Sequence, residues 1–195
     1  GVMIGTLPKG MGGVLDDLGL DPFWDAASRL GAGVFLHPMF LCGEPRLADY
    51  DLVNAIGRVA DTSIAVSRLL FSGHLLKFPG MKLVLSHGGA ALPYVLGRLA
   101  RNFTIAQGKY ADPRKGFEAL YFDSVVFDAD ALKFLAGKAG DAKIMLGSDM
   151  PFPIGDMEPC KVVHAAGFDE SQRVQIFGGT ARSVFRIRPD CWCRP

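Results

Sequence analysis

Two histidines and one aspartate each follow a short apolar run in the sequence. With their polar ends, these runs read GVFLHP, MKLVLSHGG and KIMLGSD, and they lead into His37, His87 and Asp149. Imidazole and carboxylate groups together suit a divalent ion such as zinc, and histidine also takes up and releases protons near neutral pH. If the three runs are neighbouring strands, these side chains meet at one site that could bind a metal or move a proton.

Each of the three residues also has a plain structural interpretation. His37 can be a buried histidine bonded to a backbone carbonyl, and Asp149 can cap the segment that follows it. His87 precedes Gly88-Gly89 and can belong to a simple tight turn. A His-Gly-Gly turn also occurs in esterases, but the sequence has no Gly-x-Ser-x-Gly elbow to supply their nucleophile. The recurrence of such residues at three strand ends favours a shared site.

The elements that would position these residues alternate between strand and helix patterns. This alternation predicts a parallel α/β architecture, in which the carboxyl ends of the strands form the functional face. Strands are predicted near residues 1–6, 33–36, 81–86, 119–123 and 143–146. Helices are predicted over 21–30, about 52–77, from Gly89 to about 103, 129–138, 158–166, from 169 and near 180–185, with Asp21, Asp128 and Asp169 as N-terminal caps and Gly31 as a stop.

The length of the chain limits which α/β fold these units can form. A complete eight-unit barrel takes about 250 residues. This chain has 195 residues, shows five strand–helix units and begins inside a predicted strand. We therefore expect a single domain over residues 1–195 that is an incomplete (β/α)8 TIM barrel, about the last five units, with the N-terminal strands missing. A small open sheet is the alternative.

Composition and charge exclude several classes of protein. The chain is 49% hydrophobic and 21% charged, with a formal net charge of +1, so we expect no nucleic-acid partner and no membrane partner. No apolar stretch approaches the roughly 20 residues of a spanning helix, and no basic segment suggests a signal peptide. The cysteines form no CxxC pair, which favours reduced thiols and a cytoplasmic location; they are Cys42, Cys160, Cys191 and Cys193.

Four further residues carry side chains capable of chemistry. Asp123 ends the fourth predicted strand and could orient a ligand or His87, although a purely structural role is equally open. Arg98 lies on the helix after His87 and is either a solvated surface residue or a group that reaches a substrate. His74 and His164 fall within helical patterns, where we expect them at the surface or an interface.

Beyond these single residues, whole stretches of the chain resemble a known family. They are VFLHP at 34–38, FPGMKLVLSHGGAALPYVLGRL at 78–99, LYFDSVVFD at 120–128, KIMLGSDMPFPIGDMEP at 143–159 and GGTARSVFRI at 178–187. The family is the amidohydrolase-related branch of the amidohydrolase superfamily, and the resemblance is to its aminocarboxymuconate-semialdehyde and γ-resorcylate decarboxylases. It implies a (β/α)8 barrel that binds one divalent metal ion, zinc ahead of manganese.

The resemblance implies a role for each candidate residue. His37 and Asp149 correspond to metal ligands, and His87 corresponds to the histidine that moves protons in the catalytic centre it shares with Asp149. Arg98 matches an arginine that binds a substrate carboxylate in the neighbouring subunit, which implies a homodimer and a small-molecule carboxylic acid as substrate. The family's His-x-His pair on its first strand has no counterpart in this sequence.

Together, the residues and the resemblance predict a metal-dependent, non-oxidative decarboxylase of an unsaturated or aromatic carboxylic acid, with His87 as acid and base. Metal-dependent hydrolysis or hydration on the same scaffold is the alternative activity. A second alternative is an inactive fragment, because the sequence supplies only two of the direct metal ligands in the family pattern. Either activity requires His37, His87 and Asp149 to converge at one end of the sheet.

Overall fold

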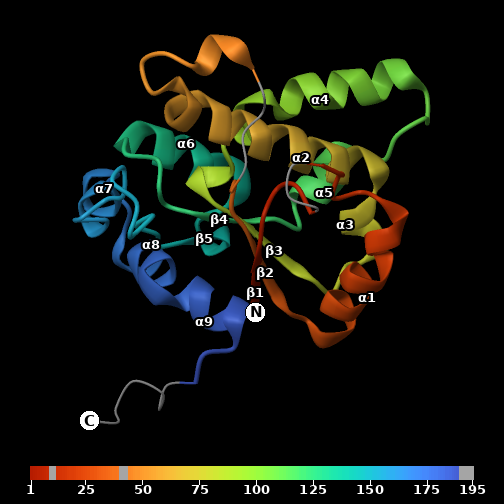
Figure 1. Ribbon diagram of the computed structural model, residues 1–195. Coiled ribbons are helices and arrows are strands. Elements are labelled where there is room, and N and C mark those ends of the chain that lie inside the picture. The colour runs from red at the N-terminus through yellow and green to blue at the C-terminus, as the bar shows by residue number, and fades with distance from the viewer. Residues whose placement is uncertain (9–11, 40–43, 189–195) are drawn as a thin grey trace.

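The computed structural model describes residues 1–8, 12–39 and 44–188. The predictions made for Cys42, Cys191 and Cys193 fall outside these residues, whereas Cys160 is a free, exposed cysteine. Within the described ranges, the chain forms a sheet of strands with helices packed around it (Figure 1).

Five strands form one parallel sheet at the centre of the fold. They are β1 (Val2–Ile4), β2 (Gly33–Leu36), β3 (Lys82–Leu85), β4 (Tyr121–Asp123) and β5 (Ile144–Met145). Each strand pairs with the next one in the chain, so the order in space is the order in sequence. A doubly wound sheet reverses its strand order at a switch point, whereas a (β/α)8 barrel continues without reversal. The predicted α/β class and incomplete barrel are therefore confirmed.

Helices follow the strands and surround them. In Figure 1, α2, α4 and α6 lie above the strands, α1 and α3 to the right, and α7 and α8 to the left. The bounds are α1 Asp21–Leu30, α2 Arg58–Ser72, α3 His74–Lys77, α4 Leu92–Ala106, α5 Pro113–Phe117, α6 Ala129–Ala139, α7 Cys160–Ala165, α8 Glu170–Val174 and α9 Thr180–Phe185. The longest, α2 and α4, have 15 residues each. No helix in the described part of the chain has the length and apolarity needed to cross a bilayer.

The two faces of the sheet pack against different partners. On one face, Leu85 and Phe122 are fully buried in the main hydrophobic core, which the surrounding helices complete. On the other face, Val84 and Met145 form a smaller cluster with Val184 of α9. Successive side chains of a strand point to opposite faces, so adjacent residues such as Val84 and Leu85 enter different clusters. Because both faces are covered from β2 to β5, these strands are nearly continuous apolar runs in the sequence, whereas Val2 and Met3 of β1 are exposed.

The ring of Phe185 in α9 lies against the sheet where two glycines leave room for it. A Cβ atom at Gly33 would come within 2.6 Å of this ring, and one at Gly1 would come within 2.8 Å. Any larger residue at Gly33 would therefore collide with Phe185, so the absence of a side chain in β2 allows α9 to pack closely.

Several helix ends predicted from the sequence are confirmed. Asp128 caps α6, and Asp169 caps α8 in a reciprocal capping box. Gly31 ends α1 in the left-handed conformation as predicted, with a φ of 56°. Gly73, which was not predicted as a stop, ends α2 in the same way, with a φ of 79°. The single helix predicted over about 52–77 is therefore two helices, α2 and α3, preceded by a wide helical turn.

Two predictions near this break are wrong. Leu20, not Asp21, holds the N-cap position of α1, because Asp21 already has helical backbone angles, with φ of −51° and ψ of −40°. The carboxylate of Asp21 accepts a hydrogen bond from Lys77 Nζ at 2.5 Å instead of capping the helix. His74 is buried rather than at the surface, with 4% exposure. Its Nδ1 lies 2.7 Å from Ser72 Oγ, and its Nε2 lies 3.3 Å from an oxygen of Asp21. The break before α3 turns this histidine toward α1.

The short helix α3 offers a matched test of the core. Leu75 is 2% exposed and packs in the main hydrophobic core, whereas its neighbour Leu76 is 44% exposed. We expect Leu75→Ala to lower the free energy of unfolding by about 2–5 kcal/mol, because it removes buried methyl groups and leaves a cavity. Leu76→Ala should change it by less than about 1 kcal/mol. Urea unfolding followed by circular dichroism measures both, and equal losses would contradict this assignment of the core.

Candidate active site

Polar residues gather where the strands end, at the carboxyl edge of the sheet. His37 follows the last residue of β2 directly, and its backbone N–H donates to the carbonyl of Ile4 at 3.0 Å. His87 lies two residues beyond β3, Asp123 is the last residue of β4, and Asp149 lies four residues beyond β5. Parallel pairing brings these ends to the same edge, as the sequence predicts.

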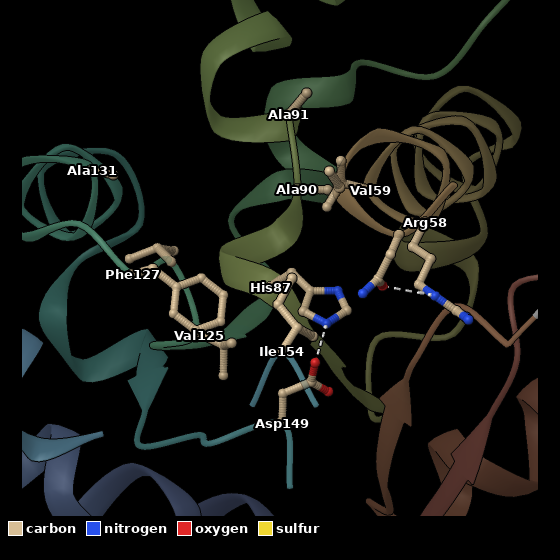
Figure 2. A pocket seen from close by; sticks show the side chains of 13 residues that line it. Arg58, Val59, His87, Ala90, Ala91, Val125, Phe127, Ala131, Asp149 and Ile154 are labelled. Atoms are coloured by element: carbon tan, nitrogen blue, oxygen red, sulfur yellow. Dashed lines mark hydrogen bonds and ion pairs between the residues drawn. The ribbon is translucent and has the colours of Figure 1, made fainter. Parts of the chain in front are cut away.

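The side chains of His37, His87 and Asp149 converge. His37 Nε2 lies 3.1 Å from one carboxylate oxygen of Asp149, and His87 Nε2 lies 3.5 Å from the other. The two imidazole rings are 5.1 Å apart between centroids and meet edge to face. Figure 2 shows the carboxylate of Asp149 directed at the ring of His87. The predicted convergence is confirmed.

This cluster fits a divalent metal ion by the chemistry and spacing of its donors. One ligand atom from each residue can be chosen so that all three lie within 4.8 Å of one another. Two ligand atoms on opposite sides of one ion, each bonded to it at about 2.0–2.2 Å, are up to about 4.4 Å apart, which is close to the observed spacing. The side chains of His37 and Asp149 are each 8% exposed and that of His87 is 13% exposed, so an ion held here would be largely shielded from solvent.

The charge state of His87 follows from its surroundings. Burial lowers the pKa of His87, and the nearby Asp149 carboxylate opposes this effect. His37 and the guanidinium of Arg58 act in the same direction as burial, because a second positive charge is disfavoured there. The imidazole is therefore neutral near neutral pH and can accept a proton, which is what a general base requires.

The turn that carries His87 has an unusual backbone. His87 itself has a φ of 55°, a left-handed value that few residues other than glycine adopt. A Cβ atom at Gly88 would lie 2.4 Å from Val126, and one at Gly89 would lie 2.6 Å from the ring of Phe122. The glycine pair therefore permits both the sharp turn and its close packing, and Asp149 shares the left-handed conformation with a φ of 57°.

Asp123 holds this turn and lies outside the cluster of three. Its carboxylate accepts hydrogen bonds from the backbone N–H groups of Gly88 at 2.9 Å and Val125 at 3.1 Å. Burial raises the pKa of Asp123 to about 6, and the backbone donors only partly oppose that rise. Of the two roles that the sequence leaves open, these contacts favour fixing the loop that positions His87.

In the described part of the chain, three cavities reach the cluster from outside: one of about 520 Å³ borders His37 and Asp149, and the other two border His87 and Asp149. The two that border His87 are described here as the larger and the smaller. The larger has a volume of about 530 Å³, and the smaller, of about 310 Å³, reaches all three residues. Figure 2 shows Val125 and Phe127 on one side of His87 and Arg58 on the other. The larger cavity is lined by Asn54, Ala55, Arg58, Val59, His87, Ala90, Ala91, Val125, Val126, Phe127, Ala131, Asp149 and Ile154. Its wall is mostly apolar, as in sites that bind small organic molecules.

Two further residues that were not predicted from the sequence, Phe152 and Arg58, lie beside the cluster. Phe152 stacks on the ring of His37, with centroids 5.6 Å apart and an angle of 8° between the planes. It lies three residues after Asp149, so its nearness in sequence was an available signal. Arg58 lines both cavities, but nothing in its helical stretch distinguishes it from a surface arginine.

The two remaining candidates lie away from the cluster. Arg98 is exposed on α4 and does not line either cavity among the residues that the structure describes. Its predicted role in a neighbouring subunit stays a prediction. His164 is exposed on α7, as expected.

Comparison with known proteins gives one family and a consistent set of relatives. A family model described as "Amidohydrolase" matches residues 1–187. The 2-amino-3-carboxymuconate-6-semialdehyde decarboxylase of Dictyostelium discoideum is 32% identical over 196 residues, which cover 97% of this chain and 54% of that protein. The chain thus spans about half the length of this relative.

Solved structures agree with this result. The 5-carboxyvanillate decarboxylase of Sphingomonas paucimobilis is 26% identical with a TM-score of 0.83, over 96% of this chain and 58% of that one. The IDCase of Metarhizium anisopliae in its apo form is 27% identical with a TM-score of 0.80, over 95% and 56%. The fold of this chain is therefore shared with these two structures.

The buried carboxyl of Asp123 predicts a specific pH dependence of stability. Its folded-state pKa of about 6 exceeds the ordinary value of 3.8, so the folded protein binds a proton more tightly than the unfolded chain. The resulting contribution to stability is complete below about pH 4 and is lost as the pH rises through about 6. The free energy of unfolding of the wild type, relative to Asp123→Asn, should therefore fall over this range.

Urea unfolding at pH 4, 5, 6 and 7 measures this difference. Asparagine keeps the oxygen that accepts from Gly88 and Val125, whereas Asp123→Ala removes it. We expect the alanine variant to be less stable than Asp123→Asn by about 2 kcal/mol or more at every pH, because two buried donors lose their partner. A difference between wild type and Asp123→Asn that stays constant with pH would contradict the raised pKa.

Proposed function

The chain belongs to the amidohydrolase family, and from this premise we propose that the protein catalyses the metal-dependent, non-oxidative decarboxylation of an unsaturated or aromatic carboxylic acid. The observation that carries this proposal is the convergence of His37, His87 and Asp149, which all line the smaller cavity, while His87 and Asp149 also line the larger cavity of about 530 Å³. The names of its relatives support it, since both the similar Dictyostelium protein and the similar Sphingomonas structure are decarboxylases.

In this proposal, His37 and Asp149 hold the metal ion. Their ligand atoms, Nε2 and a carboxylate oxygen, already lie 3.1 Å apart at the buried end of the cavity. We propose zinc because imidazole with carboxylate is a common donor set for that ion, with manganese as the alternative. A bound divalent ion would polarise the oxygens of the substrate.

His87 is the proposed acid and base. Decarboxylation breaks the bond between carbon and the carboxyl group, CO₂ leaves, and the carbon that keeps the electron pair must gain a proton. A neutral His87, whose pKa is lowered by burial, can accept a proton from the substrate and return it to that carbon. Asp123 keeps the His87 turn in place through the N–H of Gly88.

The wall of the cavity suits a flat, apolar substrate. Val125, Phe127 and Ile154 line the larger cavity, and Phe152 covers one face of His37 by stacking. Such side chains exclude water from the reacting carbon and offer flat contact to a ring or a conjugated chain.

We also propose a cytoplasmic homodimer in which Arg98 serves the partner's site. The exposed position of Arg98 on α4 leaves its guanidinium free to reach another molecule. A planar guanidinium matches a carboxylate with two parallel hydrogen bonds. This part of the proposal depends on the resemblance to the decarboxylases and on no contact within the chain.

Substitutions at this site should affect either metal affinity or the rate of turnover, depending on the residue that is replaced. We expect His37→Ala and Asp149→Ala to weaken zinc or manganese binding by about 100-fold, because each removes a direct ligand. His87→Gln should leave metal affinity nearly unchanged and lower the rate of CO₂ release by about 10²–10⁴-fold. Calorimetric metal titration and product analysis with a panel of hydroxybenzoates measure the two effects.

Two results would contradict this assignment. Release of CO₂ from the panel by the His87→Gln variant at the wild-type rate would remove His87 from the chemistry. Hydrolysis or hydration products without CO₂ would show that the scaffold performs the alternative reaction.

The dimer proposal makes a separate prediction. Arg98→Ala should mainly weaken substrate binding, by about 10-fold or more, because a charge-assisted hydrogen bond pair is lost. Mixing the Arg98→Ala protein with the inactive His87→Gln protein should restore part of the activity, since hybrid dimers contain one site with both residues. If subunits exchange and the mixture, at subsaturating substrate, is no more active than the two proteins measured separately and added, Arg98 does not act across an interface.

A further inference from the structure

Arg58 is the first residue of α2 and lies beside the proposed catalytic cluster. It lines both the larger and the smaller cavity, and both of these reach His87 and Asp149. Figure 2 shows it on the side of His87 opposite Phe127. Among the described residues that line these two cavities, it is the only arginine or lysine. Within the described part of this chain, the walls of these two cavities therefore carry one permanent positive charge, distinct from the partner's Arg98 in the proposed dimer.

The guanidinium of Arg58 is fixed in place by two hydrogen bonds. Its Nε donates to the side-chain oxygen of Asn54 at 3.1 Å, and its Nη1 donates to the carbonyl of Pro38 at 3.0 Å. A guanidinium has five N–H donors, so about three remain for another partner. Because the plane is already oriented, a ligand that binds it need not immobilise a flexible side chain.

No carboxylate in the described part of the chain neutralises Arg58. Other partly exposed arginines do have such partners: Arg68 lies 2.7 Å from Asp16, and Arg173 lies 2.6 Å from Glu170. Asp51 lines the smaller cavity together with Arg58, but the two form no ion pair. A half-buried, oriented cation without a counter-ion is suited to an anion that arrives in the cavity.

We propose that Arg58 binds an anionic group of the substrate, so that the substrate carries a second carboxylate besides the one at the His37–His87–Asp149 cluster. This inference rests on the proposed function and names the class of acid: an unsaturated or aromatic dicarboxylate. Arg58 then determines specificity, because it holds the end of the molecule that does not react. When a monocarboxylic acid binds, the remaining N–H donors of Arg58 have no partner on the substrate.

A structural role is the competing explanation. Arg58 bonds to Pro38, the neighbour of His37, so it could serve only to hold that strand end. In that case its loss would disturb the metal site and weaken the binding of every acid equally. Anion binding instead predicts a loss confined to dicarboxylates, with metal affinity preserved.

The test measures binding to the zinc-loaded protein without turnover. The probes are benzoate and its three dicarboxylate analogues, phthalate, isophthalate and terephthalate, which place the second carboxylate at three different positions. Ligand-observed NMR titration gives each affinity, since zinc is diamagnetic. We expect at least one dicarboxylate to bind about 10- to 100-fold more tightly than benzoate, as a charge-assisted hydrogen bond pair provides.

Substitutions at Arg58 test whether this residue causes the tighter binding of dicarboxylates. Arg58→Gln and Arg58→Met should abolish it and leave benzoate and zinc affinities near the wild-type values, while Arg58→Lys should keep part of it. The control is Arg29→Gln, a surface arginine of α1 paired with Asp25, which should keep the full preference.

Two outcomes overturn the inference: no dicarboxylate binds more tightly than benzoate, or the preference survives in Arg58→Gln. Equal losses for all four acids together with weaker zinc binding would also overturn it, in favour of the structural role. Since binding is measured without turnover, a failure to release CO₂ counts against the proposed function alone.

Discussion

The carboxylate of Asp149 lies between two imidazole rings, and the organisation of the carboxyl edge of the sheet depends on that contact. Its two oxygens lie 3.1 Å from His37 Nε2 and 3.5 Å from His87 Nε2. The three residues follow three different strands, β2, β3 and β5, so they meet only when those strands lie parallel and in sequential order. The fold thus converts residues more than one hundred positions apart into one group of donors.

Burial then sets the charge of each group at this edge. The side chains of His87 and Asp123 are largely buried, so the charged form of each is disfavoured, and the pKa of the histidine falls while that of the aspartate rises. The neighbours decide how far each shift goes: Asp149 opposes it at His87, and backbone N–H groups oppose it at Asp123. One environment therefore yields a neutral imidazole and a carboxyl group with a pKa of about 6, at the ends of two neighbouring strands.

The sequence was informative where chemistry and structure are local. Apolar runs that end in His37, His87 and Asp149 predicted both the strands and the shared site, because a parallel sheet places all such ends together. It failed where a side chain is positioned by another part of the chain. The burial of His74 depends on a break at Gly73 and on Asp21 of a distant helix, and the importance of Arg58 depends on the carbonyl of Pro38 twenty residues earlier. Local patterns carry no information on such pairs.

The packing of Phe185 against Gly33 restricts how this sequence can change over evolutionary time. An alanine at Gly33 would place its Cβ 2.6 Å from the ring of Phe185, so it becomes acceptable only after Phe185 has been replaced by a smaller residue. The reverse order passes through an overpacked and less stable protein. Substitutions at these two positions, one in β2 and one in α9, are therefore expected to be coupled and to occur in a fixed order. A residue larger than glycine at position 33 should be found together with a residue smaller than phenylalanine at position 185.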